Sequence, residues 1–178
     1  MDALIEFRFE DSCLGWYPIC WKALVSSLLS KGYEVSLFTR GNRPLPDKVE
    51  HIEGDRSTSL GLSALHGRKF DVIVDISGRS LEETRKVLEV TGPPQHRFLY
   101  VSSAGVYANS TSWPINEDSP LDPLSRHLGK AQTESWLIQK GIPFTSFRPT
   151  YIYGPGNYNP IERWFFDRIV HNRPIPMP

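Results

Sequence analysis

The pattern that most limits the fold is a succession of short apolar runs separated by stretches with helical periodicity. The clearest run, "DVIVDI" at 71–76, is mostly apolar and carries no alternation of polar and apolar residues. A strand of this composition is covered on both faces, as in a parallel sheet flanked by helices. Strands that alternate with helices predict βαβ units, and therefore a doubly wound α/β fold built on a parallel sheet.

The same reading places the remaining elements. We expect strands at 3–9, 33–39, 49–53, 71–76, 97–103 and 144–149. Helices are expected at 19–31, 57–66, 80–90, 126–140 and 161–171. The last helix carries Trp164, Phe165 and Phe166, which need more packing partners than a helix at a chain end normally finds. We therefore expect a second lobe to be missing; the alternative is a small compact domain that covers this helix itself.

Composition excludes several classes of protein. A chain of 178 residues can form one domain with a substantial core, and is short for two. Twenty basic and twenty acidic residues cancel, so no overall field attracts nucleic acid or an anionic membrane. Residues 126–178, however, carry seven Lys and Arg against three Asp and Glu. This excess permits local contact with an anion or with RNA; a chance excess of solvated side chains is the alternative.

Cysteine content and the ends of the chain suggest a compartment. Cys13 and Cys20 form no metal pattern and are expected to be reduced thiols, so we expect no metal site. No apolar run approaches the roughly 20 residues that span a bilayer. The start, "MDALIEFRFED", is acidic and lacks the basic region of a signal or transit peptide. We expect a chain without a membrane partner in the cytoplasm, or in the plastid stroma of a photosynthetic eukaryote.

Five short motifs follow the predicted strands in order: "KGYEVSLFTRG", "GDRS", "DVIVDISG", "VSSAGVY" and "RPTYIYGPGN". Together they resemble the extended short-chain dehydrogenases/reductases, that is, the NAD-dependent epimerase/dehydratase family. The segment "SRH-x-GK" is similar, more narrowly, to the chloroplast stem-loop binding proteins and their cyanobacterial relatives, atypical members linked to RNA binding and RNA cleavage. The resemblance implies one Rossmann-like NAD(P)-binding domain over 1–178. Its first 20 residues diverge from the family, and we expect the C-terminal substrate lobe to be absent.

The resemblance also implies a dinucleotide site. At the end of the second strand, a carboxylate would accept from the 2′-hydroxyl of NAD, whereas an arginine accommodates the 2′-phosphate of NADP. This chain has Thr39 and Arg40 there, which favours NADP; a solvated loop arginine is the alternative. Asp55 would contact adenine, or belong to an ordinary turn. The end of the fourth strand would complete the site with Ile76, Ser77 and Gly78, the glycine allowing a close approach of backbone to cofactor.

Other matches concern the catalytic relay of the family. Ser103 matches the hydroxyl that polarises a substrate carbonyl, although a serine at a strand end is equally a local backbone cap. Lys130 matches the lysine that binds the nicotinamide ribose and lowers the pKa of the catalytic tyrosine. The loop that flanks the nicotinamide is matched by Arg148, Pro149, Tyr153 and Gly154, though "YGPGN" also reads as a turn.

The tyrosine position of this relay holds Arg126. The relay needs a group that gives up and regains a proton near neutral pH, and arginine, with a pKa above about 12, cannot do so. His127 is titratable, but about 100° of helical rotation per residue turns it away from the face of Arg126 and Lys130. We expect these two cations to share a helical face suited to a phosphate, with His127 beside them. Ser103 and Lys130 would then be remnants of the relay.

The amino end departs from the family as well. Family members follow the first strand with a glycine-rich turn, whose backbone N–H groups bind the pyrophosphate. The segment that follows the first strand in this chain has a single glycine, Gly15, and places Glu10 and Asp11 where phosphate charge should settle. Dinucleotide affinity is therefore in doubt. Either the turn was lost in evolution, or the amino end is not the natural one.

Two functions follow, and whether the chain is an enzyme stays open. The first is an atypical NAD(P)-binding protein that binds stem-loop RNA, with endoribonuclease activity as a further hypothesis. The alternative is an NAD(P)-dependent nucleotide-sugar epimerase, dehydratase or reductase that uses Ser103 and Lys130. A fragment without activity is a third outcome. We favour RNA binding because the proton donor is replaced and the last third is basic.

Overall fold

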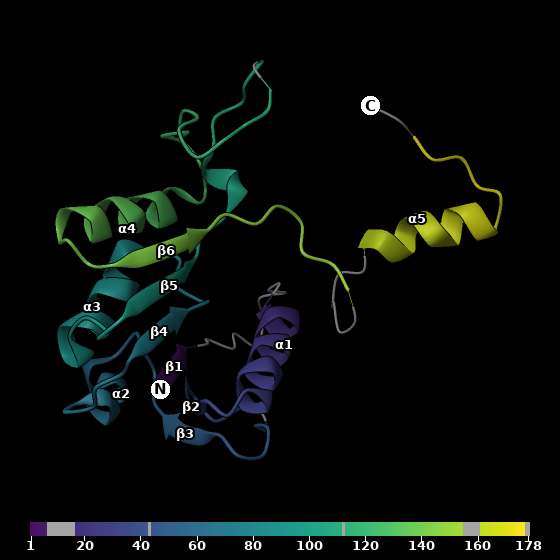
Figure 1. Ribbon diagram of the computed structural model, residues 1–178. Helices are drawn as coiled ribbons and strands as arrows, with labels where there is room; N and C mark the ends of the chain where they lie inside the picture. Colours follow the sequence, from purple (N-terminus) through teal and green to yellow (C-terminus); the bar gives the residue numbers. More distant parts are fainter. Residues whose placement is uncertain (7–16, 43, 112, 155–160, 177–178) are drawn as a thin grey trace.

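A computed structural model describes residues 1–6, 17–42, 44–111, 113–154 and 161–176. Within these residues, six parallel strands form one sheet in the order β3-β2-β1-β4-β5-β6 (Figure 1). The order reverses between β1 and β4, and this reversal is the point where open α/β sheets bind ligands. The strands are β1 (Asp2–Glu6), β2 (Glu34–Thr39), β3 (Glu50–Glu53), β4 (Val72–Asp75), β5 (Arg97–Val101) and β6 (Phe144–Phe147).

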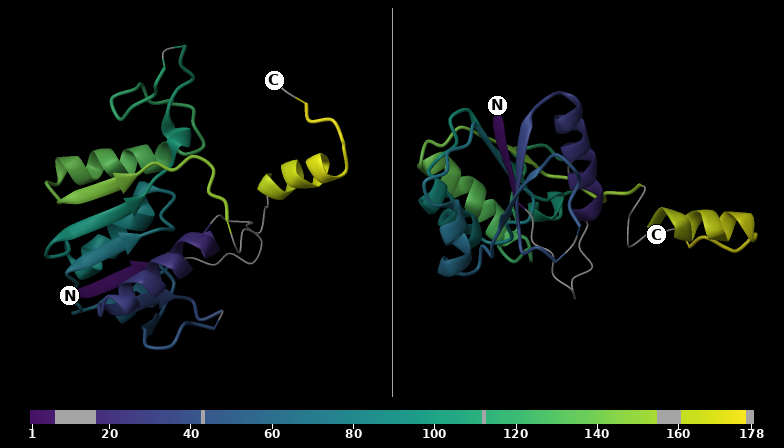
Figure 2. Two further views of the ribbon diagram at one scale, coloured as in Figure 1. Left: turned by 45° about the vertical axis from the view of Figure 1, so that its right-hand side comes forward. Right: turned by 90° about the horizontal axis from the view of Figure 1, so that it is seen from below.

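Helices cover both faces of this sheet (Figure 2). One face is covered by α1 (Tyr17–Ser30). The other carries α2 (Ser59–Leu62), the short 3₁₀ turn η1 (Ser63–Leu65), α3 (Leu81–Thr91) and α4 (Leu128–Gln139). A second 3₁₀ turn, η2 (Ala104–Val106), follows β5, and α5 (Ile161–Val170) comes last. The doubly wound α/β fold expected from the sequence is confirmed.

The core consists of two apolar clusters, one on each side of the sheet. Ile73 of β4 belongs to the cluster beneath α2, α3 and α4, and is 1% exposed. Its neighbour Val74 belongs to the cluster beneath α1, and is 5% exposed. Burial of one such side chain stabilises the fold by about 1.5–3 kcal/mol. The "DVIVDI" run therefore lacks alternation because both faces of β4 are buried.

Local sequence signals explain where several elements begin and end. Ser80 caps α3 by accepting a hydrogen bond from the backbone N of Glu83 (3.4 Å). Gly92 ends the same helix with φ +72°, a conformation that favours glycine. In α4 the expected start at residue 126 is wrong by two residues, because Leu128 N bonds to Ser125 O (3.0 Å) in a preceding turn.

Smaller corrections concern other boundaries. The expected helix at 57–66 is divided between α2 and η1. The strands β5 and β6 each end two residues before the predicted limits of 103 and 149. The predicted strand at 3–9 is observed over 2–6, and its later residues lie outside the described part of the chain.

Helix α5 lies apart from the sheet in every view (Figures 1 and 2). Its apolar side chains are exposed, with Trp164 at 43% and Phe166 at 64%. Within the helix, Trp164 and Phe165 form an edge-on aromatic pair, and the Arg168 guanidinium lies 4.5 Å from the Trp164 ring centroid. None of the helices in the described segments combines the length and the apolar character needed to cross a membrane.

Candidate functional site

A cavity of about 320 Å³ opens at the carboxyl ends of β4, β5 and β6. We call it the carboxyl-edge pocket. Three segments far apart in sequence form most of its wall: residues 101–105 after β5, the turn that leads into α4, and residues 149–152 after β6. The predicted site residues that line it are Ile76, Ser103, Arg126, His127, Lys130 and Pro149.

Hydrogen bonds hold the turn after β5 against the turn before α4. Ser103 Oγ accepts from Gly105 N (3.1 Å) and so caps η2, as expected for a serine that acts as a local backbone cap. Ser103 also lines the pocket. Ser125 Oγ donates to Gly105 O (2.6 Å) and accepts from His127 N (2.9 Å). A Cβ on Gly105 would lie 2.5 Å from Cδ2 of His127. Only a glycine lets the imidazole pack against this turn.

Arg126 and His127 are in direct contact. Arg126 Nε donates to His127 Nε2 (3.0 Å), so the imidazole is neutral, with its proton on Nδ1. Burial, together with the charges of Arg126 and Lys130, lowers the pKa of His127. The expectation that helical rotation turns His127 away is wrong, because both residues precede Leu128, the first residue of α4. His127 therefore lines the same pocket as Arg126 and Lys130.

Lys130 lies at the floor of the pocket. It is 4% exposed, and its Nζ donates to Val101 O (2.5 Å) and lies 5.3 Å from the Tyr100 ring centroid. Burial lowers the pKa of Lys130 to about 8, and the charge of Asp75 opposes this shift. Arg126, by contrast, is exposed at the rim. The two cations share the pocket, but they do not form the shared exposed face that a helix from 126 would produce.

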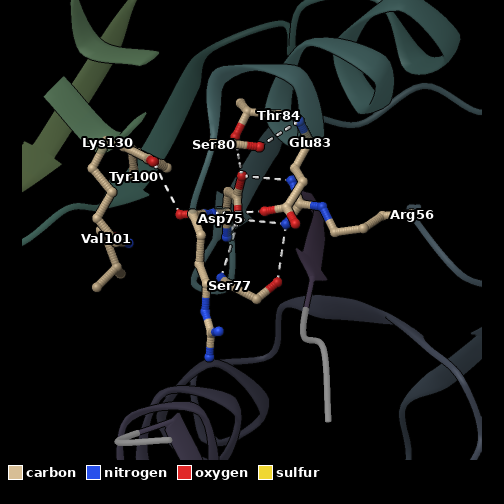
Figure 3. Close-up of polar contacts among 11 residues, drawn as sticks. Arg56, Asp75, Ser77, Ser80, Glu83, Thr84, Tyr100, Val101 and Lys130 are labelled. Carbon is tan, nitrogen blue, oxygen red and sulfur yellow. Dashed lines mark hydrogen bonds and ion pairs between the residues drawn. The ribbon is translucent and has the colours of Figure 1, made fainter. Parts of the chain in front are cut away.

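A buried ion pair lies behind Lys130 (Figure 3). Arg56 Nη1 and Nη2 donate to Asp75 Oδ1 and Oδ2, each at 3.0 Å, and the side chains are 2% and 1% exposed. Asp75 also accepts from Gly78 N and Thr84 Oγ1, each at 2.7 Å. Burial opposes ionisation of Asp75, but Arg56 and these hydrogen bonds lower its pKa to about 2.

This ion pair was not predicted from the sequence. Its signals were a carboxylate at the end of the apolar run "DVIVDI" and the arginine of "GDRS". A charged residue in a buried strand requires a partner, because an unpaired buried charge is strongly unfavourable. The sequence does not identify that partner, which comes from the segment after β3, 19 residues earlier.

The same network occupies Ser77 and Gly78, which were expected to face a cofactor. Ser77 Oγ accepts from Arg56 Nη1 (2.9 Å), and Gly78 O accepts from the Tyr100 hydroxyl (3.0 Å). Both residues are buried and outside the carboxyl-edge pocket. A Cβ on Gly78 would lie 2.5 Å from Asp75 Oδ2. The structure thus supplies a further reason for glycine at this position.

The end of β2 holds the residues expected to bind the adenosine ribose. Thr39 Oγ1 lies 2.9 Å from His51 Nε2 and accepts from Gly41 N (3.2 Å). Arg40 differs, because its Nε and Nη2 are buried and find no hydrogen-bond partner within the described segments. Asp55 Oδ1 accepts from Ser57 N (2.8 Å). None of the three expected residues lines the carboxyl-edge pocket.

The loop after β6 contributes to the site in an unexpected way. Arg148 Nε donates to Glu134 Oε2 of α4 (3.2 Å), and Arg148 Nη1 donates to the Tyr107 hydroxyl (2.8 Å). The hydrogen bond to Glu134, and to a smaller extent that to Tyr107, raises the pKa of Arg148. Arg148 therefore joins β6 to α4, and it does not line the pocket. Tyr153 is 73% exposed and also lies outside it, whereas Tyr151 lines the pocket and was not among the cofactor-binding residues expected from the sequence.

The expectations for the phosphate-binding turn and for a metal site involve residues that the structure does not describe. The phosphate-binding turn, with Glu10, Asp11 and Gly15, belongs to residues 7–16, as does Cys13. For metals, the described segments hold no group of three or more His, Cys, Asp or Glu side chains that could bind an ion.

A parallel sheet of this order, with helices on both faces and a pocket at its carboxyl edge, defines a Rossmann-like dinucleotide-binding fold. Residues 22–173 match the model of the NAD dependent epimerase/dehydratase family, and the chain belongs to this family. The family expected from the order of the motifs is confirmed.

Relatives refine this assignment. The chain is 44% identical over 167 residues to the chloroplast stem-loop binding protein of 41 kDa b of Arabidopsis thaliana, a member of the narrower group expected from the sequence. That similarity covers 85% of this chain and 44% of the relative, so the chain spans less than half the length of the Arabidopsis protein. The relative is chloroplastic.

Solved structures agree on the fold. A Methylobacillus flagellatus protein assigned to the NAD-dependent epimerases/dehydratases has a TM-score of 0.73 at 22% identity, covering 97% of this chain and 61% of that one. The UDP-glucuronic acid 4-epimerase of Bacillus cereus, in complex with NAD, has a TM-score of 0.68 at 19% identity, covering 99% of this chain and 66% of that one. Relatives of this fold therefore bind NAD. At these identities the similarity concerns the fold alone.

Proposed function

We propose that this chain is an atypical NAD(P)-binding member of the family that binds stem-loop RNA and does not oxidise or reduce sugars. The observation that carries the proposal is the contact between Arg126 Nε and His127 Nε2 in the carboxyl-edge pocket. A permanently charged guanidinium stands where the family resemblance calls for a reversible acid. The neighbouring His127 has its Nε2 lone pair occupied by that guanidinium. The pocket can therefore hold an anion, but neither Arg126 nor His127 is placed to exchange protons with a substrate hydroxyl.

Several features support RNA as the anion. Arg126 is exposed, and no carboxylate in the described part of the chain pairs with it. Arginine binds phosphate through parallel N–H donors, which suits a nucleic-acid backbone. Tyr151, 72% exposed at the pocket, provides a ring on which an unpaired base can stack. The Arabidopsis relative is a stem-loop binding protein by name.

The basic excess of the last third contributes less than its sequence count suggests. Lys130 is buried on the Val101 carbonyl, and Arg148 is paired with Glu134. Arg163 lies 3.6 Å from Asp167 within α5. Arg126 is therefore the cation of this segment that is both exposed and part of the pocket, and the proposal depends on it.

A dinucleotide also fits the residues present. The Nε and Nη2 of Arg40 at the end of β2 are buried and have no hydrogen-bond partner among the described residues. They suit the 2′-phosphate of NADP, so NADP is favoured over NAD. Thr39 and Asp55 flank the same end. Lys130 would hold the nicotinamide ribose, with Pro149 as part of the wall. A bound nicotinamide supplies hydride transfer in the family, and without a proton donor its role here is that of a ligand.

Binding of a labelled stem-loop RNA, measured by gel shift over a salt series, tests the proposal. Arg126→Ala should weaken binding roughly ten- to a hundredfold, since hydrogen bonds to charged groups contribute about 1.5–3 kcal/mol. The matched control is Arg85→Ala, which removes a half-exposed arginine of α3 paired with Glu82. Absence of binding at low salt, or equal effects of the two variants, would contradict the proposal. The same gels report whether the RNA is cleaved.

The second candidate is a nucleotide-sugar epimerase, dehydratase or reductase. It is favoured by Ser103 and Lys130, which line one pocket. Spectrophotometric assay of hydride transfer with NADP and a panel of nucleotide sugars tests it. Transfer at ordinary enzymatic rates by the natural chain, increased in Arg126→Tyr, would favour this candidate over RNA binding.

A further inference from the structure

We infer that stem-loop RNA and a nicotinamide dinucleotide compete for the carboxyl-edge pocket, so that each weakens the binding of the other. The inference rests on the proposed function and adds a form of regulation to it. RNA binding by this chain would then respond to the concentration of NADP.

The two ligands would use the same wall of the carboxyl-edge pocket. Arg126, the proposed phosphate contact, and Lys130, the proposed ribose contact, both line this single cavity. They belong to one continuous turn and helix, joined by the hydrogen bond from Lys130 N to His127 O (2.9 Å). A nicotinamide ribose held by Lys130 would therefore occupy the same cavity as an RNA phosphate held by the exposed guanidinium of Arg126.

The carboxyl-edge pocket is small. Its volume of about 320 Å³ is at the lower end of the roughly 300–1,000 Å³ of small-molecule sites. A nicotinamide with its ribose fills such a space, and no room remains for an unpaired nucleotide of RNA.

The side of the pocket formed by the turns of Gly105 and His127 cannot widen easily. His127 packs so closely on Gly105 that even a methyl group there would lie 2.5 Å from Cδ2 of the imidazole. Ser125 Oγ fastens the two turns through Gly105 O (2.6 Å) and His127 N (2.9 Å). Because these contacts fix this side of the pocket, we expect exclusion and not joint occupancy.

The adenosine half of the dinucleotide would bind outside the carboxyl-edge pocket. Arg40, the proposed contact for the 2′-phosphate, is at the end of β2 and is not part of the pocket lining. Adenosine 2′,5′-bisphosphate carries this half of NADP without the nicotinamide ribose. It should therefore bind without displacing RNA, and it separates competition inside the pocket from a general effect of negative charge.

The experiment measures fluorescence anisotropy of a labelled stem-loop RNA during titration with the chain, at constant ionic strength. Dissociation constants of NADP and of the bisphosphate are first obtained by calorimetry. At a free concentration ten times its own Kd, NADP should raise the apparent Kd of the RNA about elevenfold, as expected for exclusive binding. The bisphosphate, also at ten times its own Kd, should change the apparent Kd of the RNA less than twofold. RNA at a free concentration ten times its own Kd should likewise raise the apparent Kd of NADP about elevenfold.

The outcomes separate this inference from the proposed function. If RNA fails to bind in the absence of any dinucleotide, the proposed function is wrong. If RNA binds and its Kd is unchanged by NADP shown to be bound, the inference is wrong and the proposed function stands. The inference is also overturned if NADP does not bind at all, or if the bisphosphate displaces RNA as strongly as NADP does.

Discussion

Arg56 and Asp75 form a two-point ion pair at the carboxyl edge of the sheet, each N–O distance being 3.0 Å, with both side chains almost fully buried (Figure 3). The pair joins the segment after β3 to the end of β4. Ser77 and Thr84 complete the hydrogen bonding around it. Because Asp75 also accepts from the backbone N of Gly78, the pair shapes the chain that leads from β4 toward the pocket.

Breaking this pair should strongly destabilise the chain. Arg56→Met leaves Asp75 as an uncompensated buried charge, and we expect a loss of about 3–5 kcal/mol in the free energy of unfolding. Urea unfolding followed by circular dichroism measures it. The double variant Arg56→Met/Asp75→Leu should be less destabilised than Arg56→Met alone, since it buries no lone charge. A loss below about 1 kcal/mol, as expected for the exposed Arg85–Glu82 pair, would contradict the assignment.

The lowered pKa of Lys130 predicts how stability changes with pH. The folded chain releases this proton at about pH 8, whereas the unfolded chain keeps it to about 10.5. Between these values the unfolded state binds more protons, so stability rises with pH, by up to about 3 kcal/mol. Lys130→Met lacks the titrating group. Urea unfolding at pH 7, 8.5 and 10 should therefore show the natural chain gaining stability relative to this variant, and parallel curves would contradict the prediction.

Gly105→Ala tests the contact between the two turns of the pocket. The new methyl group would lie 2.5 Å from Cδ2 of His127, so the imidazole or the backbone must move. We expect a loss of about 1–3 kcal/mol in stability, typical of overpacking. His127→Ala removes the obstacle, so Gly105→Ala should be much less damaging in that background. A double-mutant cycle by thermal unfolding measures the coupling, and additive effects would show that the two residues do not press on each other.

The exposure of α5 predicts that its aromatic residues contribute little to the stability of this chain. Phe166 is 64% exposed, and Phe166→Ser should change the free energy of unfolding by no more than about 0.5 kcal/mol. The comparison is Phe98→Ala in β5, where the side chain is fully buried and the expected loss is about 3–5 kcal/mol. A loss above 2 kcal/mol for Phe166→Ser would mean that α5 packs on the domain in solution.

Local patterns were sufficient to predict the fold. The apolar run at 71–76 predicted a strand buried on both faces, and Ile73 and Val74 belong to cores on opposite sides of the sheet. The order of the motifs predicted the family, which the match over residues 22–173 confirms. The fold prediction succeeds because hydrophobic periodicity and turn chemistry act over a few residues, and a single sequence displays them directly. The family prediction succeeds because the motifs resemble those of the family in the same order.

The arrangement of the site depended on contacts between distant segments. Where α4 begins decides that His127 faces the pocket, and that start is set by the Ser125 turn and its bond to Gly105. The burial of Lys130 depends on β5, whose Val101 carbonyl receives its ammonium group. By itself, then, the sequence determined the sheet, its helices and the identity of the charged residues. Only the tertiary structure decided which charges are paired inside and that Arg126 remains at the rim, because pairing requires segments that the folded sheet brings together.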